Sequence, residues 1–182
     1  MNQVKLSHYD NSTYHSGGKL KKTLWYVVNI FVFKTMFPFP ASIKVRILNL
    51  FGANVGKGIV IKPNVNIKYP WFLTLGDNCW IGEDVWIDNL AQVTIGNDVC
   101  ISQGAYLLTG SHDYKKESFD LITQQIVLNE GVWIGAKATV CSGITCKSHS
   151  ILTVGSVATE DLDAYSIYQG NPATLKRKRE IS

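Results

Sequence analysis

The sequence predicts an all-β solenoid, in particular a parallel β-helix, because an apolar residue recurs every six positions. Between Leu75 and Leu107 the hexads include LGDNCW, IGEDVW, IGNDVC and ISQGAY. A second series starts at Leu128 and reads LNEGVW, IGAKAT, VCSGIT, CKSHSI and LTVGSV. A longer unit of three hexads plus two residues recurs every twenty residues, at Val55-Gly56, Leu75-Gly76 and Ile95-Gly96. Self-similarity of such short period is typical of solenoids.

A period of six fits neither the three-to-four spacing of a helix nor the alternation of a hairpin strand. It fits coils of three short strands, in which the first residue of each hexad points into a prism-shaped interior. A small residue four positions later should also point inward, which predicts burial of Cys79, Val85, Ala91, Val99 and Ala105. Stacked coils then satisfy one another's backbone hydrogen bonds and bury the apolar column.

The composition indicates one globular core. The chain has 182 residues, of which 46% are hydrophobic and 18% charged, so it is too apolar for a disordered protein and too short for two ordinary domains with linkers. Its net charge of +4 is modest, and lysine and arginine concentrate near positions 19 to 22 and 176 to 179. This charge favours anionic partners without indicating nucleic acid.

The cysteines and the start of the chain predict a cytoplasmic protein without a metal site. The four cysteines lack CxxC or zinc spacing, and we interpret them as small apolar residues, with Cys79 and Cys146 pointing inward. The first 18 residues are polar and do not resemble a signal peptide. The longest apolar run, residues 24 to 33, is well short of the roughly 20 residues that span a bilayer.

Before the solenoid we expect an arm over residues 1 to 18 and a helical cap over residues 19 to 52. One helix should cover residues 19 to 37 and end before Pro38; a second should cover residues 41 to 51 and end at Gly52. The apolar positions of the first are Leu20, Leu24, Val27, Val28, Phe31 and Phe33. These helices would cover the open first coil. Lysines, among them Lys44, border these helices. The alternative is therefore that the helices contact the surface of a membrane, at its inner face.

The β-helix should occupy residues 53 to 160, interrupted by a loop at about 110 to 125. The sequence there is polar, charged and unsuited to an inward column, and such excursions from a solenoid usually carry function. Residues 161 to 182 form a short C-terminal segment, with a turn at Gly170-Asn171-Pro172. We expect a final strand or short helix that folds back along the prism.

A resemblance to a known family rests on several of these segments. The hexads, TGSHD at residues 109 to 113 and the distal GSVATEDL and AYSIYQGNPA resemble hexapeptide-repeat acetyltransferases. YHSGG, FPFP, IKYPW, WIDNLAQVTIG and CISQGAYL are similar to the colanic acid biosynthesis acetyltransferase family, whose members O-acetylate sugars of bacterial exopolysaccharide precursors. The resemblance implies a left-handed β-helix, a homotrimer with active sites between subunits, and acetyl-CoA as donor.

The resemblance identifies His112 with the family's catalytic histidine. A neutral imidazole can accept the proton of a sugar hydroxyl as that hydroxyl attacks the thioester, and can return it to the departing thiolate. Direct transfer of this kind needs no serine or cysteine nucleophile. Asp113 adjoins His112 in sequence, so we expect another group, a backbone carbonyl or a neighbouring subunit, to orient the ring.

The matching donor positions are Trp133, Ala136, Val154 and Gly155. Backbone N–H groups near Val154 would face the thioester carbonyl, whereas Trp133 could equally be an external packing residue, like the other tryptophans at its hexad position. Several relatives carry lysine where this chain has Glu160. We therefore expect the CoA phosphates to meet the basic C-terminal run, through Lys176 and Arg177.

The predicted acceptor residues are Asp88, Asn89 and Tyr114, which could bind sugar hydroxyls or the sugar's apolar face. Aspartate and asparagine also favour turns for backbone reasons, so a structural role stays open. Acceptors such as a drug, a serine or an amino sugar are alternatives, as is a non-catalytic scaffold. A β-helix carbonic anhydrase would need three zinc-binding histidines on adjacent coils, which His112 and His149 cannot supply.

Overall fold

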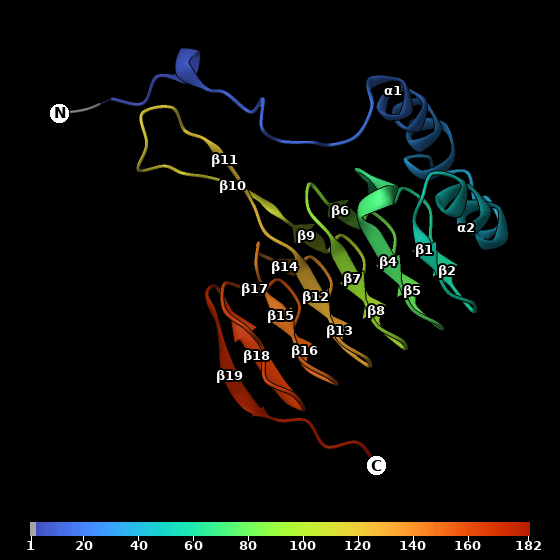
Figure 1. Cartoon of the computed structure of the whole chain (residues 1–182). Coiled ribbons are helices and arrows are strands. Elements are labelled where there is room, and N and C mark those ends of the chain that lie inside the picture. Colours follow the sequence, from blue (N-terminus) through green and yellow to red (C-terminus); the bar gives the residue numbers. More distant parts are fainter. Residues whose placement is uncertain (1–2) are drawn as a thin grey trace.

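The computed structural model describes residues 3–182 and confirms the predicted solenoid (Figure 1). Three parallel sheets form the faces of a prism. Face A contains β1 (Asn54–Val55), β4 (Leu73–Leu75), β7 (Val93–Ile95), β12 (Ile126–Leu128) and β15 (Thr145–Cys146). Face B contains β2 (Val60–Ile61), β5 (Trp80–Ile81), β8 (Cys100–Ile101), β13 (Trp133–Ile134) and β16 (Ile151–Leu152). Face C contains β3 (Asn66–Ile67), β6 (Trp86–Asp88), β9 (Tyr106–Leu108), β14 (Thr139–Val140) and β17 (Val157–Ala158).

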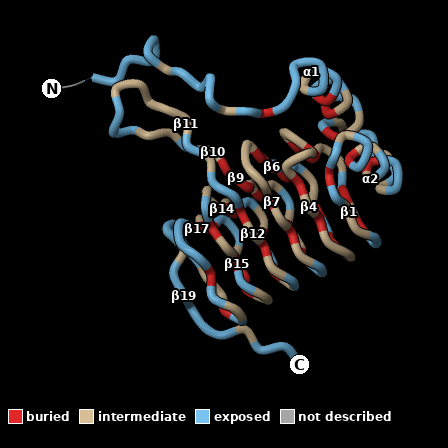
Figure 2. Tube along the Cα trace, viewed as in Figure 1, coloured by how far each residue is buried: buried red, intermediate tan, exposed pale blue. Residues whose placement is uncertain are grey.

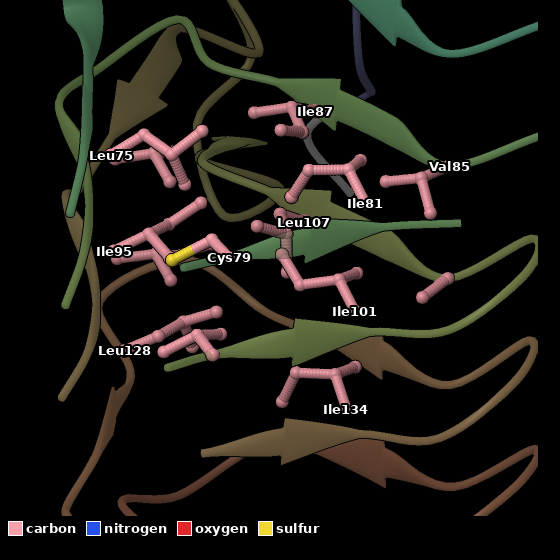
Figure 3. Packing of buried hydrophobic residues seen from close by; sticks show 14 of the residues in the cluster. Leu75, Cys79, Ile81, Val85, Ile87, Ile95, Ile101, Leu107, Leu128 and Ile134 are labelled. Carbon is pink, nitrogen blue, oxygen red and sulfur yellow. The ribbon is translucent and has the colours of Figure 1, made fainter. Parts of the chain in front are cut away.

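The interior is the predicted apolar column. Strands on successive coils pair in register, as where Val60 faces Trp80 and Trp80 faces Cys100, which confirms the twenty-residue unit. The hexad starts from Leu75 to Leu152 on regular coils are buried, and so are Cys79, Cys146 and most small residues four positions after a hexad start (Figures 2 and 3). Ala91 is the exception: it is only half-buried, because residues 89–92 form a widened corner instead of a regular hexad.

One corner of the prism takes up the departures from the six-residue period. Inward residues on either side of the corner between faces C and A, such as Ile67 and Leu75 or Ile87 and Ile95, are eight positions apart. On the next coil the same corner releases the long excursion between Leu107 and Leu128. Corners between the other faces keep the period of six. We therefore call the corner between faces C and A the wide corner.

The N-terminal helices depart from the prediction in length and orientation. α1 (Lys19–Val28) continues as a π-helix, η2 (Asn29–Phe33), and ends well before Pro38. It packs against face C through Trp25, Asn29 and Phe33, all buried. The Trp25 indole donates to the Ile67 carbonyl at 2.8 Å. Because these three residues anchor the helix, four of the predicted core positions are exposed instead: Leu20, Leu24, Val27 and Phe31.

The second helix, α2 (Ala41–Leu50), covers the open end of the first coil (Figure 1). Leu48 is fully buried, and Gly52, with φ +97°, ends the helix as predicted. Lys44 is also fully buried: its ammonium donates to the carbonyls of Ile61 and Lys62, at 3.3 and 2.9 Å, and burial lowers its pKa. Lys44 therefore saturates an exposed strand edge and does not belong to the surface that could meet a membrane.

The remaining elements lie at the wide corner and at the C-terminal end. A short 3-10 helix, η3 (Pro70–Phe72), fills the first wide corner, and β10 (Gly110–His112) pairs with β11 (Leu121–Thr123) as a projecting antiparallel hairpin. The N-terminal arm, with its 3-10 turn η1 (Leu6–His8), runs along this hairpin towards α1 (Figure 1). At the other end β18 (Ser166–Gly170) extends face B and pairs with the terminal strand β19 (Ala173–Lys178).

Candidate active site

His112 ends the first strand of the projecting hairpin, and its imidazole is oriented by the opposite side of that hairpin. The Nδ1 atom lies 2.9 Å from the Phe119 carbonyl oxygen. A carbonyl can only accept a hydrogen bond, so Nδ1 carries the proton in this contact and Nε2 of the neutral ring has a free lone pair. The expected orienting group is therefore a backbone carbonyl of the same chain.

Phe119 orients the His112 imidazole through its backbone carbonyl and through its ring. Its φ of +52° lies in the left-handed region, which a bulky residue seldom occupies. Backbone strain of this kind persists only where the surrounding structure holds it, and it often accompanies functional sites. The phenyl ring stacks on the imidazole, with centroids 4.4 Å apart and planes 8° from parallel. Phe119 thus restrains the ring of His112 from its edge and from its face.

A cavity of about 440 Å³ opens beside the hairpin, which contributes His112 and Leu121, and residues from three further parts of the chain line it. The arm contributes Tyr9, Asn11, Tyr14 and Ser16, α1 contributes Lys22, and the wide corner contributes Lys68, Tyr69 and Leu90. Its lining was not predicted, because the arm lacks the periodicity that would place it. The polar YHSGG segment was the available signal, since Tyr14 and Ser16 belong to it.

Tyr14 fastens the arm to the wide corner. Its hydroxyl donates to the Leu90 carbonyl at 2.6 Å. Burial raises the pKa of the Tyr14 phenol strongly, with smaller effects from Tyr69 and Asp88, so the hydroxyl remains a donor. Further along the arm, the Tyr9 ring lies 5.9 Å from the His112 ring. The arm therefore forms one wall of the histidine cavity.

Asp88 lies one coil below the hairpin, as expected, but its carboxylate is largely buried. Lys68 lies 2.9 Å from Asp88 Oδ1, and the Tyr106 hydroxyl donates to Oδ2 at 3.4 Å. Burial and the neighbouring carboxylate raise the pKa of Tyr106 to about 12. Lys68, not Asp88, lines the histidine cavity. Asp88 is thus positioned to hold Lys68 at the cavity wall.

Asn89 is a corner residue, and its contacts favour the structural role that the sequence left open. Its side chain is fully buried. The amide nitrogen donates to the carbonyls of Tyr69 and Phe72, at 2.6 and 3.1 Å, and the amide oxygen accepts from the Tyr69 N–H at 2.9 Å. All of its polar groups are engaged with the backbone of the preceding coil. Tyr114, the third predicted acceptor residue, is 74% exposed beyond His112 and does not line the cavity.

The predicted donor residues gather at a different corner, between faces B and C. Trp133 is half-exposed on β13, and its indole donates to the Ser102 hydroxyl at 2.9 Å. Ala136 and Val154 follow on successive coils, and the Gly155 N–H donates to the Ala136 carbonyl at 2.9 Å. Gly135 permits this stacking, because a Cβ there would lie 2.6 Å from the Val154 nitrogen. One chain thus presents the histidine and the donor residues at separate edges.

The basic C-terminal residues divide into two groups. Arg179 donates to the carbonyls of Gly131 and His149, and Lys178 donates to Ser166, so both are engaged within the chain. Lys176 and Arg177 are exposed on β19, and within residues 3–182 they have no hydrogen-bonding side-chain partner. Within residues 3–182 the structure contains no cluster of histidine, cysteine and carboxylate side chains that could hold a metal ion.

Comparisons with known proteins connect this architecture to acetyl transfer. No family model matches the sequence. WcaF of Escherichia coli, named as a colanic acid biosynthesis acetyltransferase, is 37% identical over 170 residues, which cover 91% of each chain. The hexapeptide-repeat acetyltransferase VCA0836 of Vibrio cholerae, solved with acetyl coenzyme A, superposes with a TM-score of 0.79 at 20% identity, over 90% of this chain and 89% of that one. A galactoside acetyltransferase solved with coenzyme A gives 0.78 at 19% identity, over 88% and 82%.

The hexapeptide coils and the histidine hairpin, with these likenesses, define an acetyltransferase of the hexapeptide-repeat class. The 37% identity to WcaF extends over nearly the whole length of both chains. The chain belongs to the family of colanic acid biosynthesis acetyltransferases.

The burial of Asn89 yields a prediction that separates a structural from an acceptor-binding role. Asn89→Ala should lower the free energy of unfolding by about 2–4 kcal/mol, because it leaves buried backbone groups of the preceding coil unpaired. Asn97→Ala is the matched control, since Asn97 is exposed and its amide oxygen accepts one bond, from the Asp77 N–H at 2.8 Å. Melting temperatures at one fixed protein concentration measure both variants. Unchanged stability of Asn89→Ala with a raised KM for the acceptor would contradict the structural role.

Proposed function

We propose that this acetyltransferase moves the acetyl group of acetyl-CoA to a sugar hydroxyl of an exopolysaccharide precursor, with His112 as general base. The observation that carries the proposal is the oriented imidazole: Nδ1 is bound to the Phe119 carbonyl, and the ring lines a cavity of about 440 Å³. A cavity of polar groups and tyrosine rings suits a sugar, whose hydroxyls and apolar faces need both.

The proposed reaction is a direct transfer. Nε2 of His112 accepts the proton of the acceptor hydroxyl while its oxygen forms a bond to the thioester carbonyl carbon. The tetrahedral intermediate then breaks its C–S bond, and the imidazolium returns the proton to the departing thiolate, which leaves as CoA–SH. The Phe119 carbonyl fixes the tautomer and favours the imidazolium that forms. The cysteines do not take part, since burial raises the pKa of Cys79, Cys100, Cys141 and Cys146.

We further propose that the active site is shared between subunits of a homotrimer. His112 projects from the wide corner, between faces C and A, whereas Trp133, Ala136 and Val154 line the corner between faces B and C. Two different edges of one prism cannot face each other, but a cyclic trimer brings one edge of each subunit against another edge of its neighbour. The Val154 N–H, which donates to no acceptor within residues 3–182, would then be free to stabilise the developing oxyanion.

Acetyl transfer should depend on His112. His112→Ala should reduce kcat at least 100-fold, because a positioned general base contributes about 10²–10⁴-fold. Release of CoA thiol in the presence of a sugar acceptor measures the rate, and His15→Ala, at an exposed arm histidine, serves as control. A normal rate for His112→Ala would contradict the mechanism. Absence of transfer by the wild type from any acyl-CoA would instead favour a non-catalytic scaffold.

Mixed trimers test the shared site. Val154→Trp should block the donor corner without unfolding the chain, because Val154 is 68% exposed. Each variant alone, His112→Ala or Val154→Trp, should be inactive. Co-expressed and purified through two different tags, which removes the homotrimers, the two should regain roughly a third of the wild-type activity, since every mixed cyclic trimer joins an intact histidine to an intact donor corner at about one site in three. No recovery in the mixture would place both residues in one subunit.

The exposed side of α1 supports a location at a membrane surface. Leu20, Leu24, Val27 and Phe31 form an exposed apolar strip, and Lys19 and Lys21 flank it. We propose that this strip contacts an anionic bilayer, because an apolar helical face bordered by lysines fits the boundary between head groups and acyl chains. The helix lies along the surface in this proposal. Among the described residues, no helix has the length and apolar character to cross a bilayer.

Binding to lipid vesicles tests this location. Leu24→Asp with Phe31→Asp should lower co-sedimentation with vesicles that contain phosphatidylglycerol at least tenfold, since apolar burial drives interfacial binding. Leu175→Asp, at a 51% exposed leucine of the C-terminal hairpin, is the matched control. Equal sedimentation of wild type and double variant would contradict membrane contact. Loss of the oligomer in the double variant would instead assign the strip to packing between subunits.

A further inference from the structure

A second cavity, of about 410 Å³, lies between the N-terminal helices and face C. α1 and η2 form one wall, and Asn66, Lys68, Tyr69 and Trp86 form the other. Lys22, Lys68 and Tyr69 line this cavity and also the histidine cavity. The two spaces therefore adjoin, and a ligand with its reactive end at His112 can extend into the second space. We call the second space the helix cavity.

Its charge is cationic. Lys22, Lys34 and Lys68 line the helix cavity, and its described lining contains no carboxylate. The Asp88 carboxylate, with Oδ1 2.9 Å from Lys68 Nζ, offsets the charge of Lys68. The Lys22 ammonium instead donates to a neutral group, the Ser16 hydroxyl, at 3.0 Å. Lys34 is exposed at the rim. Two ammonium groups thus remain without a counter-charge at the junction and mouth of the cavity.

The surrounding sequence strengthens this field. No aspartate or glutamate lies between Asp10 and Asp77, a stretch that carries lysine or arginine at positions 19, 21, 22, 34, 44, 46, 57, 62 and 68. The rest of the chain must be net negative, because the total is only +4. The positive charge is therefore concentrated at the end of the solenoid that holds the helix cavity, where it attracts anionic ligands.

Asn29 gives the cavity a buried polar group without a partner. Its side chain is 6% exposed and lines the cavity. The amide nitrogen donates to Asn66 Oδ1 at 2.8 Å, but the amide oxygen has no hydrogen-bond partner within the described chain. A buried acceptor that stays unpaired is costly. A ligand hydroxyl or N–H in the helix cavity would satisfy it.

We propose that the helix cavity binds the phosphate or diphosphate of a phosphate-linked sugar, and that this contact places the sugar at His112. This inference rests on the proposed acetyl transfer. Lys22 and Lys68 at the junction would hold the phosphate, and Lys34 would meet its outer end. Ammonium groups bind phosphate oxygens through strong, charge-assisted hydrogen bonds. The acceptor is then an activated or carrier-linked sugar, and a finished neutral polysaccharide is a poor substrate.

The phosphate can carry two kinds of group, a nucleoside or a lipid. A nucleoside base could stack on the exposed ring of Trp86, which itself lies on Tyr106 with centroids 4.9 Å apart. A lipid chain could leave the cavity past Tyr26, beside the apolar strip of α1. The shared element is the phosphate, and the assay distinguishes the two sources.

The test compares acceptors and lysine variants in full-length protein. Acetyl transfer is measured with methyl glucoside, with UDP-glucose and with glucose linked by diphosphate to a short polyprenyl chain in detergent. The variant is Lys22→Gln with Lys34→Gln, and the control is Lys57→Gln, an exposed lysine outside both cavities. We expect KM for a diphosphate-linked sugar at least tenfold below that of methyl glucoside. The double variant should raise that KM at least tenfold with kcat near wild type, and should raise the KM for methyl glucoside far less, because methyl glucoside has no phosphate although Lys22 also lines the histidine cavity.

Each outcome decides between the claims. A low KM for the nucleotide-linked or for the lipid-linked sugar supports the phosphate site and shows whether the phosphate carries a nucleoside or a lipid. Equal use of methyl glucoside, with no effect of the double variant, overturns the phosphate site while acetyl transfer stands. If no acceptor is acetylated, titration with inorganic diphosphate tests the cavity alone. Binding at least tenfold tighter in wild type than in the double variant then supports the site although the proposed function fails, and equal binding overturns it.

Discussion

The register between coils is the constraint on which the rest of this structure depends. Each strand must meet its counterpart one coil away, so an extra residue can be accommodated only at a corner. The chain places its extra residues at the wide corner on three successive coils, ahead of β4, β7 and β12. Tyr69, Leu90 and His112 come from these three insertions, and all line the histidine cavity. Register thus gathers residues far apart in sequence along one edge.

The cap and the site are parts of the same construction. Trp25, held by the Ile67 carbonyl, fixes α1 against face C beside the wide corner. That anchor turns Lys22 towards the cavities and leaves Leu24 and its neighbours outside. The same helix therefore covers part of face C, adds positive charge beside the site and exposes an apolar face. A cap required only for solubility would not need an apolar outer face.

Periodicity explains which parts of the fold could be predicted. Repeating residues such as Ile81 and Ile101 reveal their burial, because each hexad repeats one local environment. The orientation of α1 could not be predicted, since Trp25 and Leu24 are both apolar and only contact with Ile67 decides which turns inward. His112 is a candidate catalytic residue because the chain resembles a known family and because it lies where the repeat fails. Phe119, which orients it, has no sequence signal, because its role depends on a carbonyl and an unusual φ.

The coils and the hairpin each contribute to the position of the His112 imidazole. The coils fix where the hairpin leaves the prism: the Thr109 hydroxyl, at the base of β10, donates to the Asp88 carbonyl at 2.8 Å and accepts from the Ala91 N–H at 3.1 Å. The hairpin then fixes the imidazole through Phe119. General-base catalysis requires both, because proton transfer depends on the position of Nε2 and on its tautomer. A histidine on a flat face of the prism would have a fixed position but no carbonyl to set its tautomer. The break in the repeat allows the chain to turn back, so that Phe119 in the turn supplies the carbonyl that sets the proton on Nδ1.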